Sequence, residues 1–382
     1  MQRENEWKVH NPSGNKRVVV TKELPGEGWL EILAESDCRV EYCTSTEILG
    51  VEEIKKAIGD RCDAAIGQLT EAWGQELFQA LKNAGCTAYS NYAVGYNNVD
   101  VAAATKLGIP VGNTPGVLTE ATAEMAVALT FAAARRVVEA DKFMRSGQFK
   151  GWLPSLFLGH LLEGKTVGII GAGRIGAAYA RMMVEGHKMN LIYYDLYPNK
   201  ALEDYVSGYN EFLKSQGKNP VSCRKAESIE ELLQESDIVS LNTVLNKDTH
   251  HLMDKKNLEL MKRKSILVNA SRGPLIDEEA LVEHCKNNPE FSAALDVFEA
   301  EPAMKPGLAE LENVVIVPHI ASATFWTRTG MAVLAAYNVA RILDGYPVWQ
   351  DSDVLPFLDD NPPKAAPSIL NAKDLGIPVY SS

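Results

Sequence analysis

Residues 165–183 read KTVGIIGAGRIGAAYARMM. Three glycines, Gly171, Gly173 and Gly176, follow a short apolar run and precede a segment rich in helix-forming residues. This order predicts a strand, a tight turn and a helix in immediate succession. A second apolar run, NLIYYD, comes next and ends in Asp195. The whole succession is typical of the first half of a doubly wound parallel sheet.

The same turn predicts a dinucleotide site. We expect Gly171 to permit the turn, Gly173 to let backbone N–H groups approach a pyrophosphate, and Gly176 to let the helix pack closely on the strand. The positive end of that helix then faces the phosphates, and Arg174 adds charge there. Asp195 is placed to accept hydrogen bonds from the ribose hydroxyls and to repel a 2′-phosphate. The sequence therefore predicts NAD, with NADH preferred over NADPH.

Short apolar runs alternate with amphipathic segments along most of the chain, which indicates an α/β fold in two units. A long alanine-rich helix is expected over 119–146, at or beside the boundary, and another helix over 327–345. This last helix could pack back on the first unit, which would then be discontinuous. We interpret the proline-rich last ~35 residues as a wrapping tail. The strand candidates are 17–21, 39–43, 64–67, 87–91 and 109–114 in the first series, and 165–171, 190–195, 237–242, 265–270, 293–298 and 314–319 in the second.

Composition excludes several classes of protein. With 382 residues, 46% hydrophobic and 23% charged, the chain is globular. Its net charge of −12 argues against nucleic acid or an anionic membrane as a partner. The six cysteines are scattered, which predicts free thiols in a reducing compartment and no metal site. No apolar run is long enough to span a membrane and the N-terminus has no signal-peptide core, so we expect a soluble protein.

Polar side chains follow three late strand candidates. Arg272 comes after ILVNAS, Glu301 after AALDVFEA, and His319 after VVIVP. Ligands collect at the carboxyl ends of parallel strands, so all three could face the reactive end of a dinucleotide. Reduction of a carbonyl beside a carboxylate requires a planar cation, a proton donor and a carboxylate that favours the protonated donor. Each residue could instead be an ordinary loop residue, and composition does not decide between Glu299 and Glu301.

Four motifs, GAGRIG, NASRGPLID, ALDVFEAEP and PHIASAT, together resemble the D-isomer-specific 2-hydroxyacid dehydrogenases over nearly the whole chain. Further stretches, including SNYAVGYNNVDV and GWLPSLFLGHLLEGKTVG, are similar to the plant-type hydroxypyruvate reductase (NADH-dependent glycerate dehydrogenase) group. The resemblance implies a Rossmann cofactor domain over 123–322. It also implies a flavodoxin-like substrate domain formed by 1–122 and 323–382, with the active site in the cleft and dimerisation through the cofactor domain.

The resemblance also assigns residues. It implies a catalytic triad of Arg272, Glu301 and His319, and a substrate-carboxylate loop of Ala93, Val94 and Gly95, with Arg272 contacting the substrate as well. Asp296 is expected near the cofactor carboxamide, although an acid inside an apolar strand is costly unless it has a partner. The full expected cofactor set is Thr122, Gly171, Gly173, Arg174, Ile175, Gly176, Asp195, Thr243, Ala270, Asp296 and Ser322.

The implied activity is NADH-dependent reduction of hydroxypyruvate to D-glycerate, and of glyoxylate to glycolate, by a homodimer in glyoxylate metabolism and photorespiration. A glyoxylate- or phosphoglycerate-type dehydrogenase is an alternative, and an NAD-sensing corepressor is another from a different class. The resemblance favours a peroxisome, but the chain ends in VYSS rather than a Ser-Lys-Leu-type signal. The mitochondrial matrix and the cytosol therefore stay open.

Overall fold

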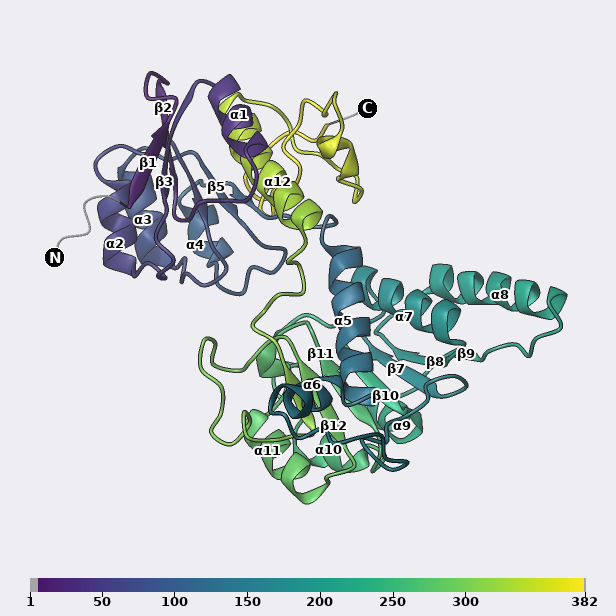
Figure 1. The fold of residues 1–382 in the computed structure, drawn as a ribbon. Helices are drawn as coiled ribbons and strands as arrows, with labels where there is room; N and C mark the ends of the chain where they lie inside the picture. Colours follow the sequence, from purple (N-terminus) through teal and green to yellow (C-terminus); the bar gives the residue numbers. More distant parts are fainter. Residues whose placement is uncertain (1–5, 381–382) are drawn as a thin grey trace. The chain divides into compact units, whose positions relative to one another are not determined.

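The computed structural model describes residues 6–380, and the chain forms two compact units (Figure 1). Unit 1 runs to Leu118 and resumes at Ala323, and unit 2 spans Thr119–Ser322. Each unit is a largely parallel sheet covered by helices on both faces, so the expected α/β class is confirmed. The first boundary lies between Leu118 and Thr119, a few residues before the Thr122 that we expected, and the helix that starts at Thr119 packs into the core of unit 2 from Ala123 onward.

Unit 1 is built on a six-stranded sheet. Strand order is β1-β3-β2-β4-β5-β6, and every neighbouring pair is parallel except β1 with β3. The five parallel strands have the order 2-1-3-4-5 of flavodoxin-like folds. The strands are β1 (Trp7–His10), β2 (Lys16–Val20), β3 (Cys38–Cys43), β4 (Ala64–Gly67), β5 (Ala88–Asn91) and β6 (Val111–Gly112).

Alternation along β2 shows how the unit 1 sheet is covered. Val18 and Val20 lie in one core cluster and Val19 in another, because successive side chains of a strand point to opposite faces. Helices α1 (Gly28–Glu35) and α12 (Phe325–Leu343) cover the first face. The other face is covered by α2 (Val51–Ile58), α3 (Gln75–Asn83) and α4 (Val101–Lys106). The C-terminal chain after α12 includes the short helix η2 (Leu355–Leu358).

Unit 2 contains a seven-stranded, fully parallel sheet in the order β13-β12-β11-β10-β7-β8-β9. Strands β7 to β12, the first six of the unit along the chain, have the Rossmann order. The glycine turn follows β7, which lies where the strand order reverses. The strands are β7 (Thr166–Ile170), β8 (Asn190–Tyr194), β9 (Cys223–Lys225), β10 (Ile238–Leu241), β11 (Ile266–Asn269), β12 (Ser292–Leu295) and β13 (Val314–Ile316).

Two groups of helices cover the faces of this sheet. On one face lie α5 (Thr119–Ala134), α7 (Arg174–His187) and α8 (Lys200–Ser215). On the other face lie α9 (Ile229–Glu235), α10 (Lys255–Leu260) and α11 (Glu278–Asn287). Both faces are apolar, which explains why β7, β10 and β11 read as continuous hydrophobic runs rather than alternating ones.

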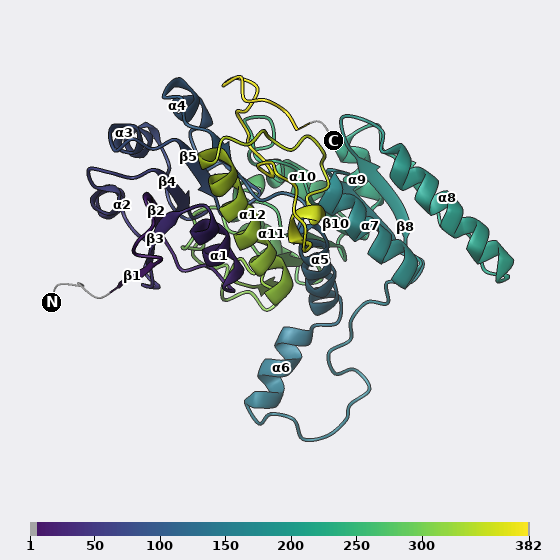
Figure 2. The same ribbon diagram turned by 90° about the horizontal axis from the view of Figure 1, so that it is seen from above.

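The single helix expected over 119–146 is wrong. The chain forms α5 and a separate helix α6 (Val137–Arg145), because Arg136 takes a left-handed conformation with φ of 53°. The carbonyl oxygen of Ala134 accepts a hydrogen bond from the His160 N–H at 2.8 Å instead of continuing the helix. Residues 137–161 then form an arm, defined here by that range, which projects from the rest of unit 2 (Figure 2).

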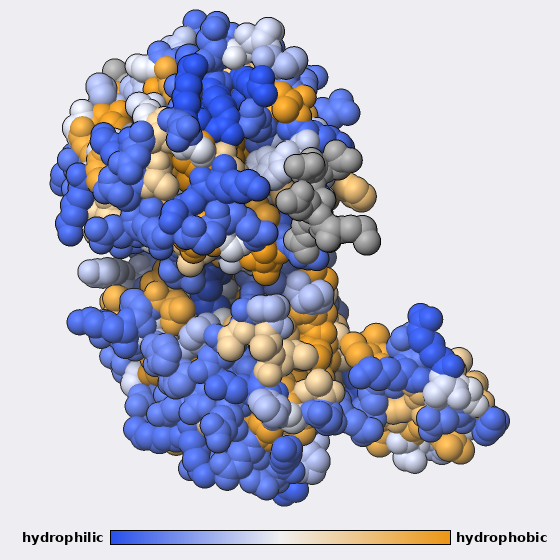
Figure 3. All heavy atoms as spheres, turned by 90° about the vertical axis from the view of Figure 1, so that its left-hand side faces the viewer, coloured by the Kyte–Doolittle hydropathy of each residue, from blue (hydrophilic) through white to orange (hydrophobic). Residues whose placement is uncertain are grey.

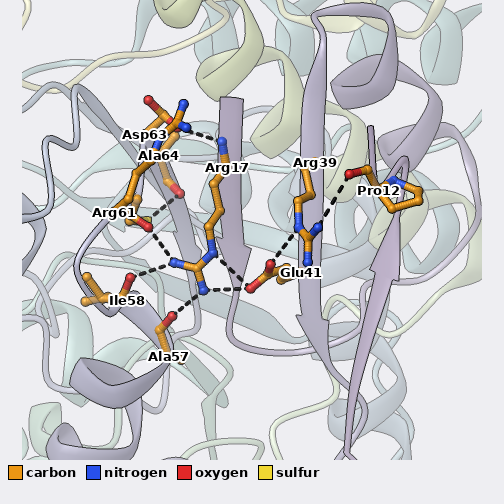
Figure 4. A network of polar contacts seen from close by, with 10 residues as sticks. Pro12, Arg17, Arg39, Glu41, Ala57, Ile58, Arg61, Asp63 and Ala64 are labelled. Atoms are coloured by element: carbon orange, nitrogen blue, oxygen red, sulfur yellow. Dashed lines mark hydrogen bonds and ion pairs between the residues drawn. The ribbon is translucent and has the colours of Figure 1, made fainter. Parts of the chain in front are cut away.

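An arginine in β2 ties the end of α2 to the unit 1 sheet (Figure 4). The Arg17 guanidinium donates to the carbonyl oxygens of Ala57 at 2.7 Å and of Ile58 and Arg61 at 2.6 Å. It also forms an ion pair with Glu41 at 2.6 Å. The carbonyl groups at a helix C-terminus lack partners within the helix, and a cation there satisfies them.

We expect Arg17→Ala to destabilise unit 1 by about 2–4 kcal/mol, because three carbonyl groups and a carboxylate lose a common donor. Urea unfolding followed by tryptophan fluorescence measures this change, since the buried tryptophans Trp29 and Trp73 both lie in unit 1. Lys8→Ala is the control. Its exposed ion pair with Glu23, at 3.6 Å, contributes less than about 1 kcal/mol. Equal midpoints for both variants would contradict the assignment.

Candidate active site

The glycine turn after β7 has the geometry expected for a phosphate-binding loop. Gly171 has φ of +93°, a conformation that side chains rarely adopt. A Cβ atom on Gly176 would lie 2.0 Å from the Gly171 carbonyl oxygen, so close packing requires glycine there too. In contrast, a Cβ on Gly173 would meet no atom within 4 Å. The open side of the turn therefore lies at Gly173, immediately before the N-terminus of α7, where the first N–H groups lack helical partners.

Asp195 lies next to this turn, at the end of β8. Its Oδ2 accepts a hydrogen bond from the Ala172 N–H at 2.8 Å, and its half-buried side chain leaves Oδ1 with only a long contact, 3.4 Å, to the Tyr197 N–H. A carboxylate beside the turn suits ribose hydroxyl groups. Arg174 and Ile175 form the first turn of α7, with Arg174 exposed and Ile175 half-buried. These residues fit the dinucleotide that the sequence predicts.

Four neighbouring strands of unit 2 bring polar residues to one edge of the sheet. Thr243 follows β10, Arg272 follows β11, Asp296 follows β12 and His319 follows β13. The strands are adjacent and parallel, so their carboxyl ends lie side by side. The loops are also bonded to one another, because the Ser271 hydroxyl donates to the Thr243 carbonyl oxygen at 2.8 Å.

His319 and Glu301 form a direct pair. The His319 Nδ1 atom lies 2.9 Å from Glu301 Oε2, and Glu301 Oε1 accepts a hydrogen bond from the Phe298 N–H at 2.9 Å. Burial opposes ionisation of Glu301, but His319, Phe298 and the charge of Arg272 outweigh it and hold the pKa of Glu301 below its usual value. Within the described residues the Nε2 atom of His319 has no partner, so it is available for proton transfer to a ligand.

Arg272 lies within electrostatic reach of Glu301. Burial lowers the pKa of Arg272, and the charge of Glu301 opposes that shift. Guanidinium groups stay charged in proteins. Its Nη1 donates to the Ser271 carbonyl oxygen at 2.6 Å. The following residue, Gly273, is packed so tightly that a Cβ atom there would lie 1.9 Å from the Phe298 carbonyl group. The loop that contains Arg272 therefore packs directly against the loop that contains Glu301.

The fully buried carboxylate of Asp296 holds the His319 loop. Its Oδ1 accepts a hydrogen bond from the Ile320 N–H at 2.6 Å and its Oδ2 one from the Ala321 N–H at 2.9 Å. Its backbone oxygen accepts from the His319 N–H at 2.9 Å. Burial raises the pKa of Asp296, against the effect of these bonds and of the His319 charge. The partners that this buried acid requires are thus backbone groups, and its contact with a carboxamide stays a prediction.

The other expected residues lie as follows. Thr122 is buried in the first turn of α5, and Ala270 and Ser322 are half-buried after β11 and β13. Ala93, Val94 and Gly95 follow β5, at the carboxyl edge of the unit 1 sheet. Their roles toward cofactor and substrate stay predictions.

Sequence reasoning missed a second histidine–glutamate pair. His251 Nε2 lies 3.0 Å from Glu299 Oε1, and Lys305 Nζ lies 3.4 Å from Glu299 Oε2. Glu299 thus has partners of its own, and of the two glutamates Glu301 is the one that contacts His319. The sequence around His250–His251 gives no indication of this contact, because Glu299, the partner of His251, is 48 residues away.

Within residues 6–380 no helix is long and apolar enough to cross a membrane. The same part of the chain contains no cluster of His, Cys, Asp and Glu that could hold a metal ion, and its six cysteines are free thiols.

Comparison with known proteins gives consistent matches. Residues 127–321 match the D-isomer specific 2-hydroxyacid dehydrogenase, NAD binding domain. The chain is 62% identical to a glycerate dehydrogenase of Cucumis sativus, over 96% of this chain and 97% of that one. It is 61% identical to a protein of Arabidopsis thaliana named glycerate dehydrogenase HPR, peroxisomal, over 97% of each chain.

More distant matches agree. A glyoxylate reductase of Korarchaeum cryptofilum is 42% identical over 86% of this chain and 93% of its own. A crystal structure of a Thermus thermophilus protein superposes with a TM-score of 0.77 at 35% identity, covering 93% of this chain and 99% of that one. Together with the glycine turn and the paired strand-end residues, these matches show that the chain belongs to the D-isomer specific 2-hydroxyacid dehydrogenase family.

Proposed function

We propose that this protein reduces hydroxypyruvate to D-glycerate, and glyoxylate to glycolate, with NADH as the reductant. The observation that carries the proposal is the 2.9 Å contact between His319 Nδ1 and Glu301, with Arg272 after β11 at the same edge of the sheet and within electrostatic reach of Glu301. The names of the Cucumis and Arabidopsis relatives support hydroxypyruvate, and that of the Korarchaeum relative supports glyoxylate.

Each group has a distinct task in this reaction. The planar guanidinium of Arg272 binds the substrate carboxylate and polarises the keto oxygen. The N–H groups of the Ala93–Gly95 loop contribute to binding the same carboxylate. His319 donates a proton from Nε2 to the keto oxygen, while Glu301 holds Nδ1 and stabilises the imidazolium before transfer. The proton becomes the hydroxyl hydrogen of the product.

The dinucleotide would be held by the glycine turn at Gly173, the first turn of α7 and Asp195, with Thr122, Thr243, Ala270, Asp296 and Ser322 as further contacts. Its nicotinamide, when bound, supplies the hydride that reduces the keto carbon. The open space at Gly173 supports this placement, because the turn is tightly packed at Gly171 and Gly176 but not there.

We expect the wild-type protein to oxidise NADH with hydroxypyruvate and glyoxylate, and poorly with phosphohydroxypyruvate, in steady-state assays. His319→Ala lowers kcat by roughly 10²–10⁴-fold, because the proton donor is lost. Arg272→Ala raises KM by roughly a hundredfold or more, because a charge-assisted, two-point contact is lost.

His251→Ala is the matched control for the catalytic pair. It removes a half-buried histidine–glutamate contact of similar length, 3.0 Å, from the neighbouring loops. We expect its kcat to stay within about twofold of the wild type, because the substitution leaves His319 and its contact with Glu301 intact. A near-normal kcat for His319→Ala, or a wild type that binds NADH but turns over no 2-keto acid, would exclude the proposed mechanism.

We also propose that Asp195 selects NADH over NADPH by repelling a 2′-phosphate. Asp195→Asn removes the charge but keeps an oxygen that can accept from the Ala172 N–H, so the glycine turn stays in place. We expect the ratio of kcat/KM for NADH to that for NADPH to fall by roughly tenfold or more, the effect of about 1.4 kcal/mol of repulsion. An unchanged ratio would show that the charge of Asp195 is not the selecting group.

A homodimer formed through the arm of residues 137–161 is the assembly that we propose. The arm carries many exposed apolar side chains, with Trp152 81% exposed, and Figure 3 shows hydrophobic residues interspersed with hydrophilic ones on the projecting arm. Apolar surface of this extent is typical of protein–protein interfaces. The exposed apolar residues are Val137, Val138, Met144, Phe149, Trp152, Leu153, Leu158 and Leu161.

Trp152→Glu with Leu158→Glu is therefore expected to shift the protein from dimer to monomer, because two charges would be buried without partners. Light scattering after size-exclusion chromatography measures the mass. Phe212→Glu, an equally apolar exposed position on α8 of the same unit, is the control and should stay dimeric. A dimeric double variant would place the interface elsewhere.

For the compartment, the peroxisomal name of the Arabidopsis relative supports a peroxisome.

A further inference from the structure

The loop of residues 92–97, called the substrate loop below, is fixed by its carbonyl groups. Three consecutive carbonyl oxygens accept hydrogen bonds from groups of unit 1, two of them from buried asparagine side chains. The bonds are Thr114 N–H to Ala93 O at 2.9 Å, Asn113 Nδ2 to Val94 O at 2.9 Å, and Asn91 Nδ2 to Gly95 O at 3.0 Å. The carbonyl groups of Ala93, Val94 and Gly95 are thus all bonded to residues at the ends of β5 and β6.

The N–H side of the same loop is different. The Ala93 N–H donates to the Asn91 carbonyl oxygen at 2.8 Å, but the N–H groups of Val94 and Gly95 donate to no atom of residues 6–380. Backbone donors normally find partners, so two adjacent ones without any are available for a ligand. Because the carbonyl groups are held on the opposite side, the direction of these donors is fixed before substrate arrives.

The Asn113 side chain is itself held by the C-terminal chain. Its Oδ1 accepts a hydrogen bond from the Ser368 hydroxyl at 2.6 Å, across 255 residues of sequence. Its carbonyl oxygen accepts from Asn338 Nδ2 on α12 at 2.9 Å, and Asn338 Oδ1 in turn accepts from the Ser368 N–H at 2.9 Å. The Val94 carbonyl can only accept, so the Asn113 amide must present its NH₂ there and its oxygen to Ser368.

We propose that Asn113 and Ser368 are positioning residues for the substrate carboxylate, so that the C-terminal chain sets the geometry of the substrate loop. This inference rests on the proposed function of Ala93–Gly95. Ser368 acts through Asn113, Asn113 acts through the Val94 carbonyl, and the N–H groups of Val94 and Gly95 contact the carboxylate. Neither positioning residue takes part in proton transfer, so their loss affects substrate binding rather than the chemical step.

A second residue of the C-terminal chain, Asn371, makes it possible to distinguish loss of positioning from loss of chain attachment. Asn371 accepts from the Val111 N–H at 2.9 Å and donates to the Thr105 hydroxyl at 2.9 Å and the Ile109 carbonyl at 3.0 Å. It attaches the same chain to the N-terminal segment of unit 1 but makes no bond to the substrate loop or to Asn113. Asn371→Ala is therefore the matched control for loss of attachment.

The experiment compares Ser368→Ala, Ser368→Thr, Asn113→Asp and Asn371→Ala in the full-length protein. Ser368→Ala should raise KM for hydroxypyruvate roughly tenfold, with kcat and the KM for NADH within about twofold. Ser368→Thr keeps the hydroxyl and should restore most of the affinity. Asn113→Asp sets an oxygen against the Val94 carbonyl oxygen and should raise KM further. Asn371→Ala should lower thermal stability with an unchanged KM.

Hydrogen–deuterium exchange gives a readout that does not depend on activity. Amides of residues 92–97 should exchange faster in Ser368→Ala than in the wild type, and at the wild-type rate in Asn371→Ala. Unchanged exchange and KM in Ser368→Ala would overturn the proposal, as would equal effects of Ser368→Ala and Asn371→Ala. A wild type that reduces no 2-keto acid would refute the proposed function, while faster exchange confined to the loop would still show the positioning effect.

Discussion

A buried carboxylate at the carboxyl end of a parallel strand fixes the loop that carries His319 in unit 2. Asp296 is fully buried, and both of its oxygens accept backbone N–H groups from the chain just after His319. An ionised carboxylate without such partners would be too costly at this depth. The bonds hold His319 in a left-handed conformation with φ of 52°, which few residues other than glycine adopt without support. The position of the imidazole, and hence its pairing with Glu301, depends on this one acid.

Much of unit 2 could be predicted from the sequence because its signals are local. The glycine turn combines an apolar strand, a forced positive φ at Gly171 and a contact at Gly176 that excludes any side chain. The residues at strand ends could be predicted as well, since adjacent parallel strands end at a common edge. The strands β1 and β9 were not among the candidates, because β1 is mostly exposed and β9 spans three half-buried residues.

Contacts between distant parts of the chain could not be predicted in the same way. The break at Arg136 depends on a bond between Ala134 and His160, which no helical propensity encodes. Glu299 and Glu301 are equivalent by composition, and the family resemblance, not the local pattern, pointed to Glu301. Their different partners, His251 and His319, come from loops that only the sheet order brings near them. Asn113 and Ser368 likewise have no distinguishing local pattern, because their contact joins residues that are 255 positions apart in the chain.

The two units present backbone N–H groups by the same physical device, which suits the anion-binding roles that we propose for both. In unit 2, tight packing at Gly171 and Gly176 fixes a turn whose open side at Gly173 leads to the N–H groups at the start of α7. In unit 1, bonds to three carbonyl oxygens fix a loop whose N–H groups at Val94 and Gly95 stay without partners among the described residues. Neutral backbone donors can bind an anion without an added cation, which matters in a protein of net charge −12. In the proposed reaction, the charged side chain of Arg272 is then needed only for the carboxylate and the keto oxygen of the substrate.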